Sequence, residues 1–146
     1  MFGRRSVVAL ASCALLLGCG PAEPLRVGFI GWDIAIPCYS ALVTPLMGAL
    51  DPAKIEVLAF VVDAPDATLE RLRRQGLSAF ALRNDTSFDA AGEAAKIARQ
   101  VASFDLDVLV DLGDCLGPTP LLQLHRPAPV QVTWQNMLGP CPDPAI

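Results

Sequence analysis

The stretch from Ile55 to Val62, which reads Ile-Glu-Val-Leu-Ala-Phe-Val-Val, decides the fold class of this chain. Its apolar run is nearly continuous and rich in β-branched residues, which is typical of a strand buried on both faces of a parallel sheet. Just beyond it, Asp66 is placed to cap a helix that runs through Gln75 and stops at Gly76. A buried strand followed by a short helix predicts one βα unit of an α/β domain.

The same alternation extends in both directions along the chain. Upstream, Leu25 to Ile30 predicts a strand, and Ser40 to Leu50 predicts a helix that Pro45 should kink or shorten, because proline lacks a backbone donor. Downstream we expect strands at Ser78–Leu82, Val108–Leu112 and Pro129–Trp134, and helices at Asp89–Phe104 and Pro120–Leu124. The order β-α-β-α-β-α-β-α-β predicts a single Rossmann-like, doubly wound, mainly parallel sheet covered on both faces.

The helix from Asp89 to Phe104 has the clearest pattern. Its apolar residues recur at three- and four-residue steps: Ala90, Ala94, Ile97, Ala98 and Val101. Its polar residues are expected on the opposite face: Glu93, Lys96 and Gln100. The small alanines should let this helix pack close to the sheet.

Composition narrows the range of functions. The 146 residues fit one compact domain, and 53% of them are hydrophobic, so a core can form. The formal net charge of −4 speaks against nucleic acid as a partner, since that partner needs a basic face.

The first 24 residues differ from the rest. Arg4 and Arg5 precede an apolar run from Ser6 to Leu17, which is too short to span a bilayer. Leu16-Leu17-Gly18-Cys19 then resembles the lipobox of a bacterial lipoprotein signal, which makes Cys19 the lipidation residue. The alternatives are a mis-assigned start codon and a chance apolar helix.

We therefore predict a signal segment at 1–19, a short tether at 20–24, and a Rossmann-like lobe at 25–146 that is truncated at its carboxyl end. A genuine signal predicts a membrane-anchored lipoprotein, and otherwise the chain is cytoplasmic.

No metal or cofactor site is predicted. The cysteines beyond the signal, Cys38, Cys115 and Cys141, are widely spaced, and His125 is the single histidine of the chain. Asp111 and Asp114 flank a strand end, where carboxylates either make turns or hold a cation, and turn chemistry is the favoured interpretation.

Three stretches resemble the O-linked N-acetylglucosamine transferase (SPINDLY-like) glycosyltransferases. Leu25-Arg26-Val27-Gly28-Phe29-Ile30 is similar to the opening strand of that family, and Leu50 to Val57 is similar to the entry of its second strand. The most specific stretch joins Asp107-Val108-Leu109-Val110-Asp111-Leu112 to Arg126-Pro127-Ala128-Pro129-Val130-Gln131-Val132-Thr133-Trp134.

The resemblance implies one lobe, the amino-terminal one, of a two-lobe catalytic region. It also implies a UDP-N-acetylglucosamine-like donor and a Ser or Thr acceptor, so that an active chain would be a hexosyltransferase. The second lobe carries most of the donor contacts in that family, and it is absent from these 146 residues. We therefore expect no catalysis by this chain alone, and a second lobe or a protein as its partner.

Ligands of such sheets bind beyond the carboxyl ends of the strands. Three loops meet that condition, 31–39, 113–119 and 135–139, and from them we predict donor contacts at Asp33, Gly113 and Gly139. The alternative for Asp33 is that it caps its own turn. The donor-facing histidine of the family corresponds to Pro37, so no catalytic residue is assigned.

A second hypothesis starts from the lipobox. A lipid-anchored periplasmic binding protein of an importer also combines such a signal with an α/β domain that begins with a strand. Fatty acid found on Cys19 favours this hypothesis, whereas an unprocessed Met1 in the soluble fraction favours the transferase-like one.

Overall fold

A computed structural model describes residues 23–31, 34, 37–83, 90–113 and 119–134. Strands and helices alternate along this part of the chain, as the sequence predicts. The elements are β1 (Leu25–Ile30), α1 (Pro37–Gly48), β2 (Ile55–Val62), α2 (Asp66–Arg74), β3 (Ser78–Leu82), α3 (Ala90–Ala102), β4 (Val108–Asp111), α4 (Thr119–Gln123) and β5 (Val130–Thr133).

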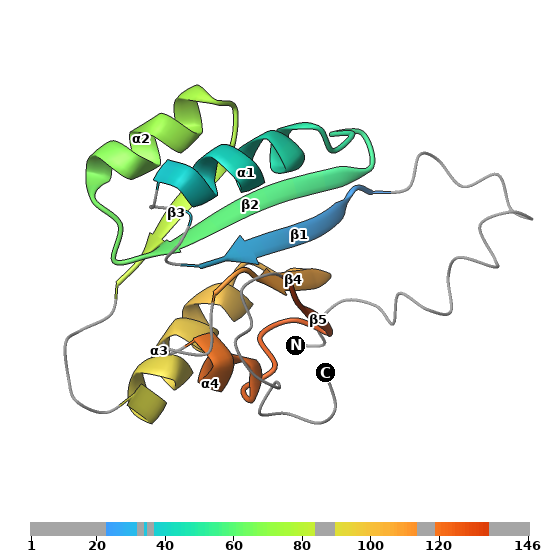
Figure 1. Cartoon of the computed structure of the whole chain (residues 1–146). Coiled ribbons are helices and arrows are strands. Elements are labelled where there is room, and N and C mark those ends of the chain that lie inside the picture. The colour runs from blue at the N-terminus through green and yellow to red at the C-terminus, as the bar shows by residue number, and fades with distance from the viewer. Residues whose placement is uncertain (1–22, 32–33, 35–36, 84–89, 114–118, 135–146) are drawn as a thin grey trace, which may run out of the picture.

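The strands form one sheet in the order β3-β2-β1-β4-β5, and every neighbouring pair is parallel. Helices α1 and α2 lie on one face of this sheet and α3 and α4 on the other (Figure 1). The predicted α/β fold class with a doubly wound parallel sheet is therefore confirmed. The strand order reverses between β1 and β4, which makes that point the topological switch of the sheet.

Each face of the sheet carries its own hydrophobic core. Beneath α1 and α2, Val43 and Met47 of α1 pack with Leu69 and Leu72 of α2 and with sheet residues such as Val61. On the other face, the α3 residues Ala94, Ile97, Ala98 and Val101 are all buried, as the three- and four-residue spacing predicts. Burial of this much apolar surface is the main force that holds the two layers to the sheet.

One part of the sheet is left open on the face that carries α1 and α2. Val130 and Val132 pair in register with Val108 and Val110, so these four side chains share a face. Val130 is 50% exposed and Val132 is 42% exposed, and Trp134, two residues on, is 37% exposed. The edge strand β5 therefore presents an apolar stripe to solvent.

Helix α1 differs from its prediction. It begins at Pro37, three residues before the expected start, and it continues through Pro45 to Gly48. The expected shortening at Pro45 is wrong because Ala41 and Pro45 both lie on the exposed side of the helix, where water can satisfy the carbonyl that loses its donor.

Two details of α2 and α3 are also corrected. Asp66 is the first residue of α2 rather than its cap, since Pro65 holds the cap position and makes no side-chain cap bond. The predicted stop is correct, because Gly76 has a φ of 85° just beyond the helix. In α3, Glu93 is buried instead of lying on a solvent face.

Gly28 shows why a small residue is required inside β1. A Cβ atom at this position would lie 2.5 Å from the Cδ1 atom of Leu106 and 2.8 Å from the ring of Phe60. Such distances are well inside van der Waals contact, so the close packing of this face depends on the missing side chain.

Candidate functional site at the carboxyl edge of the sheet

The switch point brings together the ends of β1 and β4. Gly31 donates its N–H to the carbonyl oxygen of Phe60 (3.2 Å), and Leu112 donates to Ile30 (2.8 Å). A Cβ atom added to Gly31 would lie 3.2 Å from the Cβ atom of Leu112 and 3.5 Å from the nitrogen of Gly113. The two predicted ligand loops therefore start in direct contact, at the position where sheets of this class bind ligands.

Asp111 is the buried acidic residue of this edge. Its Oδ1 atom accepts a hydrogen bond from the backbone N–H of Gly113 at 2.8 Å, which is the turn chemistry predicted for it. Its Oδ2 atom accepts a hydrogen bond from Nε2 of Gln123 at 2.6 Å. With 2% of its surface exposed, Asp111 ties the end of β4 to α4.

Gln123 extends this contact to β5. Its Nε2 atom lies 3.2 Å from Oγ1 of Thr133, and the Thr133 hydroxyl lies 3.4 Å from Gln123 Oε1. Gln131 donates from its side chain to the carbonyl oxygen of Gln123 at 3.1 Å. The sequence did not predict a role for Gln123, because a five-residue helix is too short to show a pattern that indicates which of its side chains are buried.

The structure tests only part of the predicted site. Gly113 is buried at the switch point, and its N–H is engaged by Asp111, so that donor is not available to a ligand in this arrangement. Asp33, Gly139 and the lipidation residue Cys19 lie outside the described residues. Their assigned roles stay predictions.

His125 is exposed in the turn between α4 and β5, where its N–H donates to the carbonyl oxygen of Leu122 at 3.0 Å. The single histidine of the chain therefore faces solvent. Cys115 and Asp114 lie outside the described residues.

Metal-ligating side chains do not gather in the described ranges: no three His, Cys, Asp or Glu residues there are arranged to hold an ion. No helix within the same ranges is long and apolar enough to cross a bilayer.

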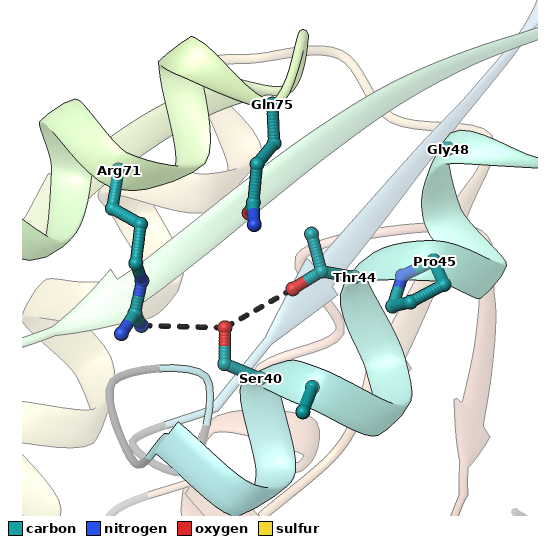
Figure 2. Close-up of a pocket in the computed structure, with 7 residues that line it drawn as sticks. Ser40, Thr44, Pro45, Gly48, Arg71 and Gln75 are labelled. Atoms are coloured by element: carbon teal, nitrogen blue, oxygen red, sulfur yellow. Dashed lines mark hydrogen bonds between the residues drawn. The ribbon is translucent and has the colours of Figure 1, made fainter.

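A hollow lies between α1 and α2, away from the ends of β1 and β4. It has a volume of about 350 Å³ and is lined by Ser40, Ala41, Thr44, Pro45, Gly48, Arg71 and Gln75. Figure 2 shows Arg71 and Gln75 reaching from α2 towards the hydroxyl groups of Ser40 and Thr44 on α1. Arg71 donates from Nη2 to Ser40 Oγ (3.2 Å) and to the carbonyl oxygen of Ile34 (3.3 Å).

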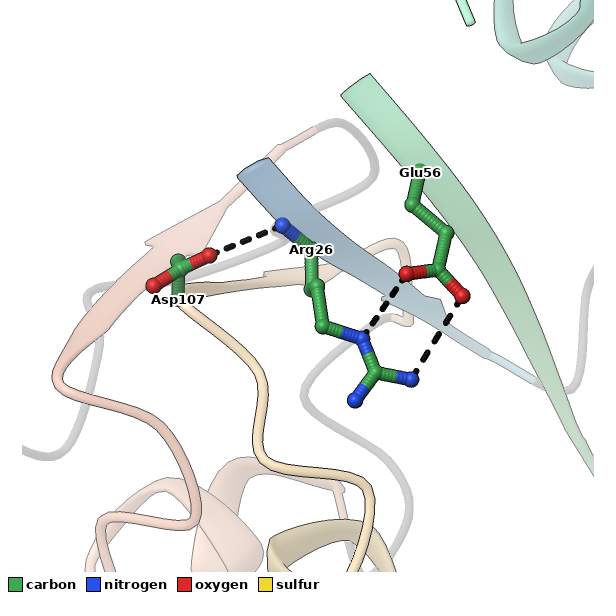
Figure 3. Close-up of polar contacts among 3 residues, drawn as sticks. All are labelled: Arg26, Glu56 and Asp107. Atoms are coloured by element: carbon green, nitrogen blue, oxygen red, sulfur yellow. Dashed lines mark hydrogen bonds and ion pairs between the residues drawn. The ribbon is translucent and has the colours of Figure 1, made fainter. Parts of the chain in front are cut away.

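The amino edge of the sheet is organised differently (Figure 3). Arg26 donates its backbone N–H to a carboxylate oxygen of Asp107 at 2.8 Å, and its guanidinium Nε pairs with Glu56 at 2.9 Å. Arg26 and Glu56 are register partners on β1 and β2, so the ion pair bridges adjacent strands. These contacts hold the starts of three strands together.

This amino-edge cluster joins the three stretches that carry the family resemblance. Arg26 comes from the first, Glu56 from the second and Asp107 from the third. Arg26, Glu56 and Asp107 therefore lie at the edge opposite the one where ligands of such sheets bind, and they hold the strands together.

Comparison with known proteins gives one line of support. The chain superposes on a solved lysine-to-methionine mutant of the O-GlcNAc transferase of Thermobaculum terrenum with a TM-score of 0.58 and 28% sequence identity. The match covers 80% of this chain and 23% of that transferase chain. No family model matches this sequence, and no curated protein is a significant match.

The fold, the switch-point geometry and this similarity agree with one another. The described residues form a single parallel α/β sheet like the one present in the bacterial transferase. The chain thus has a glycosyltransferase-like, Rossmann-like fold that resembles part of an O-GlcNAc transferase.

Proposed function

We propose that this chain is the amino-terminal lobe of a glycosyltransferase of the protein O-N-acetylglucosamine type, which contributes one wall of a site for a UDP-sugar donor. The observation that carries the proposal is the similarity to the Thermobaculum terrenum enzyme, 28% identity over 80% of this chain. Ser and Thr side chains of proteins are the acceptors that this type of chemistry implies.

The carboxyl edge supports the position of the donor. Gly31 and Gly113 lie next to each other at the switch point, and neither glycine adds a side chain there. Asp111, Gln123 and Thr133 form a rigid floor beside it, because each is hydrogen-bonded to another. A preorganised wall of this kind binds a ligand without a large ordering cost.

We further propose that the lobe alone does not catalyse transfer. The match covers 23% of the transferase chain, so the similarity extends over only part of that enzyme. Half of a two-lobe site supplies only part of the binding free energy, and a Kd of about 1 mM corresponds to only about −4 kcal/mol.

The test combines a binding and a transfer measurement on the full 146-residue chain. We expect saturation-transfer NMR to detect UDP-N-acetylglucosamine with a Kd of about 1 mM or weaker. Radiolabelled donor incubated with Ser- and Thr-containing peptides should give no labelled peptide. Labelled peptide above the no-protein control would overturn the proposed inactivity, and absence of any donor contact would overturn the proposed donor site.

Localisation is tested separately. The lipid-anchored binding-protein alternative rests on Cys19, and no observation within the described residues favours it. Metabolic labelling with a fatty-acid analogue, compared between the wild type and Cys19→Ala, distinguishes an anchored form from a cytoplasmic one. Label that depends on Cys19 would place the protein outside the cytosol and away from a nucleotide-sugar donor.

A further inference from the structure

We infer that the hollow between α1 and α2 is a binding site for the phosphate group of a small molecule. It is separate from the switch point, since its lining residues come from α1, from Arg71 of α2 and from Gln75 just after α2, and not from the ends of β1 and β4 (Figure 2). The inference is independent of the proposed transferase function.

Among the described residues, the cation at this site, Arg71, has no counter-ion. Arg71 is half-buried and forms no ion pair with any carboxylate of the described residues, whereas Arg74, one turn away, pairs with Glu70 at 2.9 Å. Both hydrogen bonds of Arg71 come from Nη2 and end on neutral oxygens. A partly desolvated guanidinium without an anion is costly, and a bound anion removes that cost.

Two donor nitrogens of Arg71 have no hydrogen-bond acceptor among the described residues. Its Nε atom is buried without a hydrogen-bond partner, and Nη1 makes no hydrogen bond to the described residues. The guanidinium presents its donors in a planar fork that suits phosphate oxygens. The contacts to Ile34 and Ser40 hold that fork in a defined orientation beside the hollow.

The remaining lining completes a set of donors. The hydroxyl groups of Ser40 and Thr44 lie 3.1 Å apart, and either can donate to an anion while the other donates to its neighbour. The carboxamide of Gln75 adds N–H donors on the α2 side. None of the described residues that line the hollow is acidic, so these residues do not repel an anion.

The volume of the hollow indicates a ligand that is larger than a single inorganic ion. A volume of about 350 Å³ lies within the range of small-molecule sites, and Ala41, Pro45 and Gly48 provide an uncharged wall beside the donors. The shared chemistry is a phosphate group, carried on a small uncharged body or present as the free ion.

The experiment is an NMR titration of the ¹⁵N-labelled full chain with inorganic phosphate at constant ionic strength, followed by glucose 1-phosphate. We expect saturable shifts confined to α1 and α2, at backbone amides such as Thr44 and at the side-chain amide of Gln75. Tighter binding of glucose 1-phosphate identifies a phosphomonoester as the ligand, and equal affinity identifies free phosphate. A linear, non-saturating response to both probes would overturn the inference.

Two variants with matched controls locate the site. Arg71→Gln should weaken binding about tenfold or more, whereas Arg74→Gln, with the same change of charge on the same helix, should leave the Kd unchanged. Gln75→Glu puts a carboxylate at the hollow without removing any hydrogen bond that holds the fold, and it should weaken binding by a similar factor. Its control is Gln100→Glu on α3, across the sheet.

Arg71 also supports the loop at Ile34, so Arg71→Gln is informative only if its amide spectrum stays native-like. Gln75→Glu does not depend on that condition. Unchanged affinity in Gln75→Glu, or a loss of affinity in Arg74→Gln equal to that in Arg71→Gln, would show that phosphate does not bind here.

Discussion

The two edges of the sheet each contain an acidic residue from β4 or its flank, and the two residues have different roles. Asp107 lies at the amino edge, where it accepts the N–H of Arg26 beside an exposed ion pair. Asp111, four residues later, lies at the carboxyl edge and is buried against Gln123 and Gly113. The comparison shows that one family-like stretch, Asp107 to Leu112, supplies an acidic residue to each edge: Asp107 supports the strand starts at the amino edge, and Asp111 joins β4 to α4 at the carboxyl edge.

Substitutions at the carboxyl edge should lower the free energy of unfolding more than substitutions at the amino edge. Asp111→Ala removes the acceptor of two buried donors, and we expect a loss of about 3 kcal/mol in the free energy of unfolding, measured by urea denaturation. Asp111→Asn keeps one oxygen acceptor and should lose less, about 1 kcal/mol. A loss below about 0.5 kcal/mol for Asp111→Ala would mean that water replaces the carboxylate, and that the edge is open to solvent.

The second-largest loss in the free energy of unfolding should follow from a substitution of Asp107, the carboxylate at the amino edge. Asp107→Ala leaves the partly buried N–H of Arg26 without its acceptor, and the expected loss is about 1.5 kcal/mol in the same denaturation experiment. Asp107→Asn retains an acceptor and serves as the control. If Asp107→Ala costs more than Asp111→Ala, the ranking of the two edges is wrong.

The smallest effect should follow from breaking the Arg26–Glu56 ion pair. Glu56 is half-exposed, so Glu56→Gln should cost about 0.5 kcal/mol at low salt and almost nothing at about 1 M salt. Glu70→Gln, which breaks the exposed pair with Arg74 inside α2, is the matched control and should behave alike. A salt-independent loss above about 2 kcal/mol for Glu56→Gln would show that this pair is a larger part of the fold than its exposure indicates.

The site was only partly predictable. The sequence indicated the loops after Ile30 and Leu112 as candidates, because ligands of parallel sheets bind beyond the carboxyl ends of the strands. The structure then showed that these two ends are neighbours, since β1 pairs with β4. The sequence also predicted the turn chemistry of Asp111. It did not predict Gln123, since burial of that side chain depends on how α4 packs against β4 and β5.

The environment of Arg71 was also not predictable from the sequence. The spacing of Arg71 to Arg74 puts both residues on one side of α2, so the helical period does not distinguish them. The structure separates them, because α1 lies against Arg71 and takes its hydrogen bonds while Arg74 remains exposed. Periodicity reports the direction of a side chain from its own helix, but not which neighbour it meets.

The sequence by itself determined the order of strands and helices, the parallel sheet and the family likeness, because runs such as Ile55–Val62 have few alternatives to a buried strand. Only the tertiary structure decided which polar residues work together. The Asp111–Gln123–Thr133 network, the amino-edge cluster and the hollow around Arg71 each join residues from different elements. Local patterns reflect short-range backbone and burial preferences, whereas these contacts arise only once the layers have packed.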